Sequence, residues 1–540
     1  MFKIADFIKA RRKIIESEYN FLNERQKQAV FHTEGPLLVL AGAGSGKTTV
    51  IINKIGHLIR FGSAYSSNRI PDGISEADAE ILEWYANGEL DELPPHLEAA
   101  LCENPVPPWQ ILAITFTNKA AGELKSRLAA KLGDRASDIS AGTFHSTCVK
   151  ILRRDIDKLG YDRSFTIYDS TDQQTVVKGC LKELGIDDKK FPPRAVLAAI
   201  SNAKDALITP DEFARQYKSD FYYSKIADIY SLYQKKLKSD SALDFDDLIV
   251  KTVELFEGFP EVLEYYQNRF KYILVDEYQD TNGLQDSIFT LISRDNKNMF
   301  MVGDLKQSIY RFRLARPELF MEKYHSYSLE DSEEQRIDLH KNFRSRKEVL
   351  FDVNFIFRKI MHRNLGNVEY DDNTALYAGI EFPKLVTNVE TDDLTAAKSP
   401  LSGSEILLFD ADSVTETNAR EAEARMIGGQ IKAIVGRELV YDKESRHYRK
   451  AEYRDIVILL RSLSGWSEEF LAVLSDMGIP AYTGTRSGYF SALEVRTVLS
   501  FLRVLDNPRQ DIPFTAVLTS PIGTFATEEL AKIRTENPEV

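Results

Sequence analysis

The chain has 540 residues, of which 28% are charged and 43% are hydrophobic. This balance is typical of a folded globular protein, and at roughly 150 residues per domain the length predicts three or four domains. The net charge of −13, from 69 Lys and Arg against 82 Asp and Glu, argues against a protein that coats nucleic acid through charge alone. A localised basic track across an acidic body stays compatible with it.

No run of 18 apolar residues occurs, so we expect no transmembrane helix. Residues 1–13 carry scattered charges and predict an amphipathic helix rather than a secretory signal. Cys102, Cys148 and Cys180 lie far apart, which argues against a disulfide framework and against a zinc or iron–sulfur site. We therefore expect a cytoplasmic protein that does not bind membranes.

Short apolar runs alternate with helical patterns along most of the chain. The runs are mostly β-branched or aliphatic and do not alternate with polar residues, as is typical of strands buried on both faces of a parallel sheet. The predicted strands are 37–41, 111–116, 272–275, 299–302, 406–409 and 456–460. An α/β fold with right-handed crossovers is the expected architecture.

A glycine-rich turn follows the first predicted strand and leads into a helix. Backbone N–H groups at its glycines can converge on phosphate oxygens, and the helix dipole adds to this attraction. Lys47 is expected to reach the β- and γ-phosphates, and Thr48 to bind Mg²⁺. Ala41 replaces the glycine that usually opens this pattern. The predicted phosphate-binding residues are Gly42, Ala43, Gly44, Ser45, Gly46, Lys47 and Thr48.

Two acidic residues come directly after the predicted strand 272–275. Asp276 is placed to join the Mg²⁺ shell, and Glu277 to orient or deprotonate an attacking water. The alternative is that these acids only cap the next helix. Because the chain also has the glycine-rich turn, we expect nucleotide hydrolysis.

Further motifs follow in a fixed order along the chain. They are LNERQKQAV (22–30), AGAGSGKT (41–48), TFTNKAA (115–121), GTFHS (142–146), DFDDL (244–248), VDEYQDTN (275–282), GDLKQSIY (303–310) and NFRS (342–345). Their order resembles that of UvrD/PcrA/Rep-type superfamily-one DNA helicases. The resemblance implies two RecA-like P-loop motor domains with parallel sheets and helical insertions, with ATP and Mg²⁺ between them and single-stranded DNA across their top.

The resemblance also assigns roles to residues at the nucleotide. Gln26 would read the adenine, Gln307 would sense the γ-phosphate, and Arg344 would reach it from the second motor domain like an arginine finger. Phe343 stands where the family usually has a Tyr that stacks on the base. Thr49 stands where many members have a stacking Arg, so we expect weaker adenine stacking here.

A second set of residues matches positions that line the DNA path in the family. Aromatic faces stack on any base, and hydroxyl, amide and Arg groups bind phosphates. At position 312 a Phe replaces the Trp of UvrD and PcrA. For each aromatic residue the alternative is an ordinary place in the core. The predicted DNA-binding residues are Phe116, Thr117, Asn118, His145, Tyr310, Phe312 and Arg313.

The resemblance divides the chain into segments. The first motor domain would occupy 1–148, with an acidic, Pro- and Gly-rich insertion at 63–109, and resume at 243–335 after a helical insertion at 149–242. An incomplete second motor domain would occupy 336–507. Residues 508–540 would open a second helical insertion.

The two halves resemble different relatives. Residues 1 to about 295 are most similar to PcrA, whereas the remainder is more similar to AddA, a helicase–nuclease subunit, which implies a possible AddB-like partner subunit. The stretches that carry the second resemblance are DLKQSIYRFRLA (304–315), PELF (317–320), VEYDD (368–372), YRDIVILLR (453–461), GYF (488–490) and DNPRQDIP (506–513).

The resemblance implies an ATP-dependent DNA helicase that moves 3′→5′ on single-stranded DNA and unwinds duplex at single-strand/double-strand junctions in repair or recombination. A TxHxxKGLEF-like stretch and a later Arg motif, both expected in the second motor domain, do not occur before Val540. The alternative is therefore a nucleotide-gated fragment that binds single-stranded DNA and has an incomplete ATPase site. A P-loop kinase or transporter ATPase fits the DNA-path motifs poorly.

Overall fold

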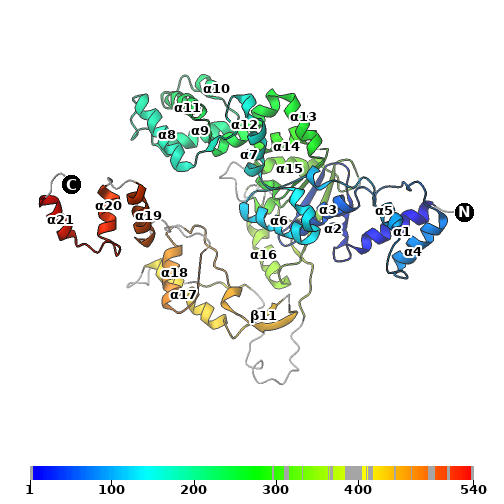
Figure 1. Ribbon diagram of the computed structural model, residues 1–540. Helices are drawn as coiled ribbons and strands as arrows, with labels where there is room; N and C mark the ends of the chain where they lie inside the picture. The colour runs from blue at the N-terminus through cyan, green and yellow to red at the C-terminus, as the bar shows by residue number, and fades with distance from the viewer. Residues whose placement is uncertain are drawn as a thin grey trace. The chain divides into compact units, whose positions relative to one another are not determined.

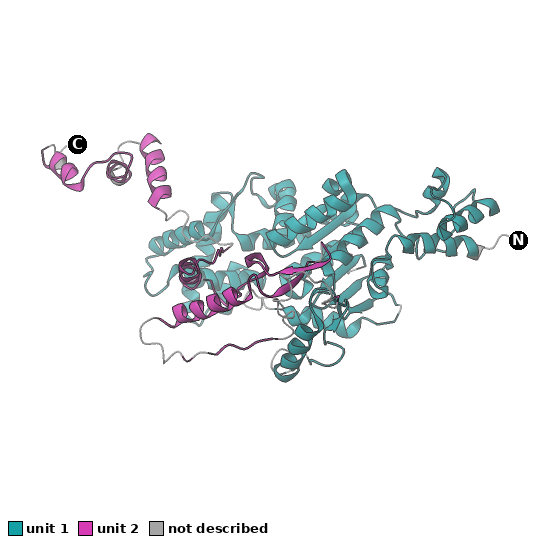
Figure 2. Ribbon diagram, turned by 90° about the horizontal axis from the view of Figure 1, so that it is seen from below, with its two compact units in different colours: residues 1–382 teal, residues 383–540 magenta. Residues whose placement is uncertain are grey.

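The computed structural model describes residues 4–294, 297–308, 316–330, 332–362, 364, 369–383, 404–408, 410, 418–442, 445–463, 465–483, 493–506 and 511–536. The chain forms two compact units, unit 1 (residues 1–382) and unit 2 (residues 383–540), which are coloured separately in Figure 2. Among the helices in the described ranges, none combines the length and the apolar character needed to cross a membrane.

A six-stranded parallel sheet forms the centre of unit 1, with the strand order β3-β2-β6-β7-β1-β8. All residues of β1, β2 and β7 are buried, as expected for strands covered on both faces. The α/β class with a parallel central sheet is therefore confirmed. The strands are β1 (Leu37–Ala41), β2 (Ile111–Thr115), β3 (Ser140–Thr143), β6 (Tyr272–Val275), β7 (Met299–Gly303) and β8 (Gln335–Leu339).

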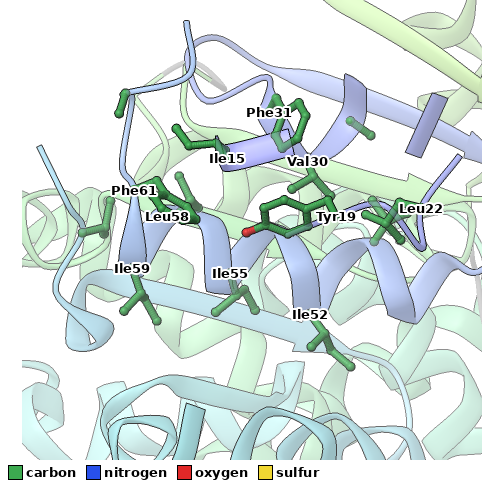
Figure 3. Packing of buried hydrophobic residues seen from close by; sticks show 14 of the residues in the cluster. Ile15, Tyr19, Leu22, Val30, Phe31, Ile52, Ile55, Leu58, Ile59 and Phe61 are labelled. Carbon is green, nitrogen blue, oxygen red and sulfur yellow. The ribbon is translucent and has the colours of Figure 1, made fainter. Parts of the chain in front are cut away.

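Alternate residues of β1 enter two separate cores on opposite faces of the sheet. Leu37 and Val39 join one hydrophobic cluster, and Leu38 joins the other. Figure 3 shows part of the first cluster, where Tyr19 and Phe31 pack with residues of α3. Helices with residues in this cluster are α1 (Ile4–Ser17), α2 (Glu24–Phe31), α3 (Lys47–Arg60), α4 (Glu76–Asn87), α5 (Pro95–Ala100) and α6 (Asn118–Leu132).

The second cluster covers the other face of the sheet and includes Phe144, Phe256 and Phe289. Its helices are α7 (Phe144–Asp155), α12 (Phe245–Gly258), α13 (Pro260–Arg269), α14 (Gly283–Ile292) and α15 (Pro317–Ser326). Figure 1 shows these helices beside the helical insertion.

The helical insertion has a core of its own. It contains α8 (Ser170–Glu183), α9 (Pro193–Asp205), α10 (Pro210–Gln216) and α11 (Phe221–Ser239). Two short parallel strands, β4 (Thr166–Ile167) and β5 (Ala242–Leu243), join where it leaves and re-enters the motor fold.

A buried ion-pair cluster also ties the insertion to α12. The Lys204 ammonium lies 2.6 Å from a carboxylate oxygen of Asp244 and 2.8 Å from one of Asp247. Both acids belong to the capping box that begins α12. The cluster therefore fixes the end of α9 against the start of α12.

The chain continues in unit 1 past β8. Two short parallel strands, β9 (Lys341–Asn342) and β10 (Tyr377–Ala378), flank α16 (Lys347–Ile360) along the chain. β8 spans the predicted motor-domain boundary at 335/336 and belongs to the sheet of unit 1. The domain limits themselves stay predictions.

Unit 2 has small hydrophobic clusters and no parallel sheet among its described residues. The strands β11 (Leu439–Asp442) and β12 (His447–Lys450) form an antiparallel hairpin. The helices are α17 (Ala419–Ile434), α18 (Ser467–Asp476), α19 (Leu493–Asp506), α20 (Asp511–Leu518) and α21 (Thr527–Glu536).

Two strand predictions in unit 2 are wrong. Residues 406–408 and 456–460 form no strand, and Phe409 lies outside the described residues. Leu408 and Leu459 are each 88% exposed. An apolar run becomes a strand buried on both faces only where neighbouring strands bind its backbone and both faces are covered. Ile456, Ile458 and Leu460 pack partly against the clusters of α17 and α18, but no strand pairs with this run among the described residues of unit 2.

Candidate nucleotide and DNA sites

Three loops meet at the carboxyl edge of the unit 1 sheet because their strands are adjacent in the order β6-β7-β1. The loop after β1 contains residues 42–46, the loop after β6 begins at Asp276, and the turn after β7 begins at Asp304. In parallel α/β sheets this edge is where ligands bind. The topology therefore brings the predicted nucleotide residues together.

The loop after β1 has the geometry of a phosphate cradle. Gly44 and Gly46 have φ values of +68° and +88°, which favour glycine. A Cβ on Gly44 would lie 2.6 Å from Asn342 Nδ2, and one on Gly46 would lie 2.8 Å from Gln26 Nε2. The buried Ser45 hydroxyl has no hydrogen-bond partner among the described residues, and α3 starts at Lys47 without a side-chain cap. N–H groups at such a helix start can bind a phosphate.

Lys47 connects the three loops. Its Nζ lies 3.1 Å from Glu277 Oε2 and 3.0 Å from Gln307 Oε1. The side chain of Lys47 is only 12% exposed, so its charge is paired in a largely buried setting. The structure thus brings together Lys47, the predicted catalytic acid and the predicted γ-phosphate sensor.

The acidic pair after β6 is held in an unusual backbone conformation. Glu277 has φ +53° and ψ +41°, the left-handed region, which costs a non-glycine residue about 1–3 kcal/mol. Its N–H donates to Asp276 Oδ1 at 3.0 Å. Burial, together with the adjacent Glu277 carboxylate, raises the pKa of Asp276 to about 6, and Lys47 opposes this.

The oxygen donors available here suit Mg²⁺. Asp276 contributes a carboxylate at the end of β6, and Thr48 contributes a hydroxyl in the first turn of α3. Mg²⁺ prefers one or two carboxylates together with substrate phosphates. The donor set therefore fits the predicted metal site.

The segment after β8 lies against the cradle. Asn342 Nδ2 donates to the Ala43 carbonyl at 2.7 Å, and the Phe343 N–H donates to the Gly44 carbonyl at 2.8 Å. The Arg344 N–H donates to Asn342 Oδ1 at 2.8 Å. Residues 342–344 therefore belong to the surroundings of the nucleotide loop within unit 1.

The residues predicted to contact the base occupy different surroundings. The Gln26 amide donates to the Ser45 carbonyl at 2.8 Å and accepts from the Asn23 N–H at 3.1 Å, so both ends are used. The Phe343 ring lies against Gly379, where a Cβ would be 2.7 Å from it. Thr49 lies in the first turn of α3. Adenine contacts of these residues stay predictions.

Three of the predicted DNA-binding residues, Phe116, Thr117 and His145, line one cavity of about 440 Å³, which we call the DNA-side cavity. Phe116 also packs partly against the hydrophobic core. Its ring therefore has both features that we considered for these aromatic residues, a place in the core and a face that a base could contact. Thr117 caps α6 through its hydroxyl, and Asn118 is the first residue of that helix. Burial lowers the pKa of His145, while Asp246 opposes this. Tyr310, Phe312 and Arg313 lie outside the described residues.

Sequence reasoning missed the polar wall of this cavity. Asn202 and Asp205 come from α9 of the insertion, Asp246 from α12, and Asp280 from the loop after β6. Burial, with a smaller contribution from a neighbouring acid, raises the pKa of Asp205 and of Asp280 to about 7. The α9 residues carried no motif signal, because only the fold of the insertion brings them to this cavity.

Two buried polar residues that lie beside the predicted nucleotide residues were also missed. Gln279 and Asp304 are 1% exposed and hydrogen-bond to each other at 2.9 Å, through the Asp304 N–H and Gln279 Oε1. Both stand inside the motifs at 275–282 and 303–310. The sequence signal that could have identified Gln279 was its place inside the motif 275–282, two residues after Glu277.

Comparison with known families matches nearly the whole chain. The UvrD/REP helicase N-terminal domain matches residues 22–70 and 97–328, and the UvrD-like helicase C-terminal domain matches residues 337–540.

Individual relatives carry the same signal. ATP-dependent DNA helicase PcrA of Staphylococcus aureus (strain Mu50 / ATCC 700699) is 35% identical over 521 residues, which is 96% of this chain and 58% of the relative. PcrA of Bacillus subtilis (strain 168) is 34% identical over 513 residues, 94% of this chain and 57% of the relative. PcrA of Staphylococcus epidermidis is 35% identical over 514 residues, 95% and 58% respectively.

The chain thus spans 58% of the length of the S. aureus protein. The similarity to PcrA continues through the second half, so the separate resemblance of that half to AddA stays a prediction. Since the two family models together cover more than half of the chain and include every motif described above, the chain belongs to the UvrD/REP helicase family.

Proposed function

We propose that this chain is an ATP-dependent DNA motor that moves 3′→5′ on single-stranded DNA and unwinds duplex at single-strand/double-strand junctions in repair or recombination. The observation that carries the nucleotide part is the position of Lys47, within 3.1 Å of Glu277 and 3.0 Å of Gln307. The direction of movement and the pathway rest on family membership.

In this proposal the residues around Lys47 change partners when the nucleotide binds. The β- and γ-phosphates attract Lys47 away from its pairing with Glu277. The released carboxylate then orients or deprotonates the attacking water. Gln307 stays at the γ-phosphate, where its amide reports whether that phosphate is present.

Mg²⁺ held by Thr48 and Asp276 would neutralise charge on the phosphate oxygens. The chain itself supplies the position of these ligands, because the first turn of α3, which follows β1, and the end of β6 lie at the same carboxyl edge of the sheet, with β7 between the two strands. Arg344 follows Asn342, whose side chain binds the cradle, and is therefore a candidate for stabilising charge on the γ-phosphate.

The DNA part of the proposal is supported by the cavity beside α7. Phe116 offers an aromatic face and Thr117 a hydroxyl, the two kinds of group that bind single strands without reading their sequence. Three acids also line the cavity, so phosphates would bind outside it and a base inside it. We make no proposal for an AddB-like subunit, because the PcrA relatives match along 96% of the chain.

The test is steady-state ATP turnover by the purified chain, with and without saturating single-stranded DNA, with Lys47→Ala as the control for contaminating ATPase. Turnover that DNA stimulates and that Lys47→Ala abolishes is the expected result. Failure to bind either ATP or DNA would contradict the proposal. Binding of both ligands with negligible turnover would favour a nucleotide-gated DNA-binding protein instead.

A further inference from the structure

Lys47 belongs to a closed ring of hydrogen bonds, and two other members of the ring have no role in the mechanism above. Starting from Lys47, the ring runs through Glu277 to Gln279, then through Asp304 to Gln307 and back to Lys47. Its hydrogen bonds measure 3.1, 2.7, 2.9, 3.0 and 3.0 Å in that order. These members are Asp304 and Gln279, and Gln279 joins the ring through both ends of a buried side-chain amide.

Gln279 uses both ends of its amide. Its Nε2 donates to Glu277 Oε2 at 2.7 Å and also lies 3.4 Å from Asp280 Oδ2. Its Oε1 accepts from the Asp304 N–H at 2.9 Å. One side chain therefore contacts the predicted catalytic acid, an acid of the DNA-side cavity, and the start of the turn that carries Gln307.

The fit around this amide is close. A Cβ on Gly303 would lie only 2.4 Å from Gln279 Oε1, so a larger residue there would displace the amide. The Gln279 main chain is also bound, because the Ser308 hydroxyl donates to its carbonyl at 3.4 Å. Gln279 is thus fixed to both ends of the 304–308 segment.

Asp280 connects the same amide to the DNA-side cavity. It lines the cavity together with Phe116 and His145 and is 8% exposed. Its Oδ1 is buried and has no hydrogen-bond partner among the described residues. A DNA strand that enters the cavity and binds Asp280 therefore changes the surroundings of the Asp280 carboxylate. This carboxylate and that of Glu277 both contact the Gln279 amide.

We propose that Gln279 is the positioning residue that couples occupancy of the DNA-side cavity to the orientation of Glu277. The inference rests on the proposed function, since it requires both an ATP site and a DNA site. Once phosphates attract Lys47, Gln279 is the described side chain that still donates to Glu277. A buried amide that loses a partner is penalised, so Gln279 must follow a shift of Asp280 or of the 304–308 segment, and Glu277 must follow Gln279.

Binding linkage tests this coupling without requiring turnover. The dissociation constant of a non-hydrolysable ATP analogue with Mg²⁺ is measured on the full chain, with and without saturating oligo(dT). The ratio of the two constants is the coupling factor, and allosteric factors typically lie at about 5–150-fold. We expect a wild-type factor in this range.

Gln279→Met keeps the length of the side chain and removes its hydrogen bonds. The expected result is a coupling factor close to one, with the analogue still bound in the absence of DNA. The matched control is Gln267→Met, because Gln267 also joins two elements, donating to the Leu291 carbonyl at 2.8 Å, outside the ring. It should keep the wild-type factor.

Gly303→Ala provides a second route if Gln279→Met does not fold, as judged by thermal unfolding. The added methyl would lie 2.4 Å from Gln279 Oε1 and 2.8 Å from Phe320 Cε2, so the amide must move while keeping its chemistry, and the coupling factor should again fall toward one. In turnover assays both variants should lower the DNA-stimulated kcat more than they raise the KM for ATP.

The outcomes separate the inference from the function on which it rests. A Gln279→Met or Gly303→Ala protein that folds and keeps the wild-type factor overturns the inference and leaves the proposed function intact. A wild-type factor of one also overturns it. A wild-type chain that fails to bind the analogue or oligo(dT) contradicts the proposed function first, and the inference with it.

Discussion

Unit 1 and unit 2 contain similar apolar runs but bury them differently. In unit 1 the run 37–41 is a strand with every residue buried between two helical layers. In unit 2 the run 456–460 forms no strand, and Val457 and Leu459 are 76% and 88% exposed. An apolar run of this kind therefore indicates only that a segment can be buried. Whether the segment forms a strand depends on neighbouring strands that bind its backbone.

The two units also differ in where their charges lie. Unit 1 buries charged clusters, such as Lys204 with Asp244 and Asp247, and concentrates its polar motifs at one sheet edge. Unit 2 keeps its ion pairs near the surface, for example Arg449 with Asp455 at 2.7 Å. The nucleotide chemistry should therefore depend on unit 1 side chains, and four substitutions test this contrast.

Glu277→Gln should have the largest effect. It removes the carboxylate that Lys47 and Gln279 hold, so ATP turnover should fall by about 10²–10⁴-fold while the Kd for ATP changes little. Glu438→Gln is the matched control, since Glu438 is a buried acid of unit 2 at 8% exposure. Equal turnover by Glu277→Gln and the wild type would show that another group activates the water.

Lys204→Met should destabilise unit 1. The substitution leaves Asp244 and Asp247 buried without their cation, and breaking a buried pair in this way costs about 3–5 kcal/mol. Urea unfolding measures the loss of stability, and hydrogen exchange shows whether it is concentrated in α9 and α12. Arg449→Met in unit 2 is the control and should have a much smaller effect. A similar loss for both variants would remove the contrast between buried and surface pairs.

Phe116→Ala should weaken binding of single-stranded DNA by about 1–3 kcal/mol, because one stacking face is lost. Fluorescence anisotropy with labelled oligo(dT) measures this change. Phe351→Ala removes a ring that is 70% exposed on α16 and controls for the general loss of an aromatic. Unchanged affinity in a folded Phe116→Ala protein would assign Phe116 to the core alone.

Asp205→Asn should have the smallest effect, visible as a pH dependence. Burial, with Asp246, raises the pKa of Asp205 to about 7 in the folded state, whereas an unfolded Asp has a pKa of about 3.9. Between these values the folded state holds a proton that the unfolded state releases, so the wild type loses stability as the pH rises. The Tm of the variant relative to the wild type should therefore be higher at pH 8 than at pH 5.

The control for this pH effect is Asp228→Asn, an exposed acid on α11. Asp246, Asp280 and His145 titrate at the same cavity in both proteins and largely cancel in the difference. A Tm difference that is the same at pH 5 and pH 8 would show that Asp205 is ionised in the folded protein throughout.

Local pattern predicted four of the six strands of the unit 1 sheet, whereas β3 and β8 were not predicted, because β3 is short and β8 alternates buried and half-buried residues. The strands at 37–41 and 272–275 have the predicted limits, and the predicted triad of Lys47, Glu277 and Gln307 meets at one edge. Each motif follows its own strand, and the parallel topology then brings the strand ends together. Sequence order and one physical rule therefore placed Lys47 and Glu277 at this edge, whereas the role expected of Gln307 came from the family resemblance.

Features that depend on distant packing could not be predicted in this way. The α9 residues that line the DNA-side cavity are placed there by the way the insertion folds back onto α12. The ring of hydrogen bonds that includes Gln279 depends on the spacing between the ends of β6 and β7. The left-handed conformation of Glu277 also had no signal in its sequence. In unit 2 the predicted strands failed because the pattern contains no information about their neighbours.

Hydrogen exchange of the full chain, with and without a non-hydrolysable ATP analogue and Mg²⁺, tests most directly the claim that the nucleotide binds at the carboxyl edge of the unit 1 sheet. Amides in residues 42–49, 276–280, 303–308 and 342–345 should become protected, while those in 404–408 and 445–463 of unit 2 should keep their exchange rates. Protection confined to unit 2, or none in the four unit 1 segments despite bound nucleotide, would contradict the account.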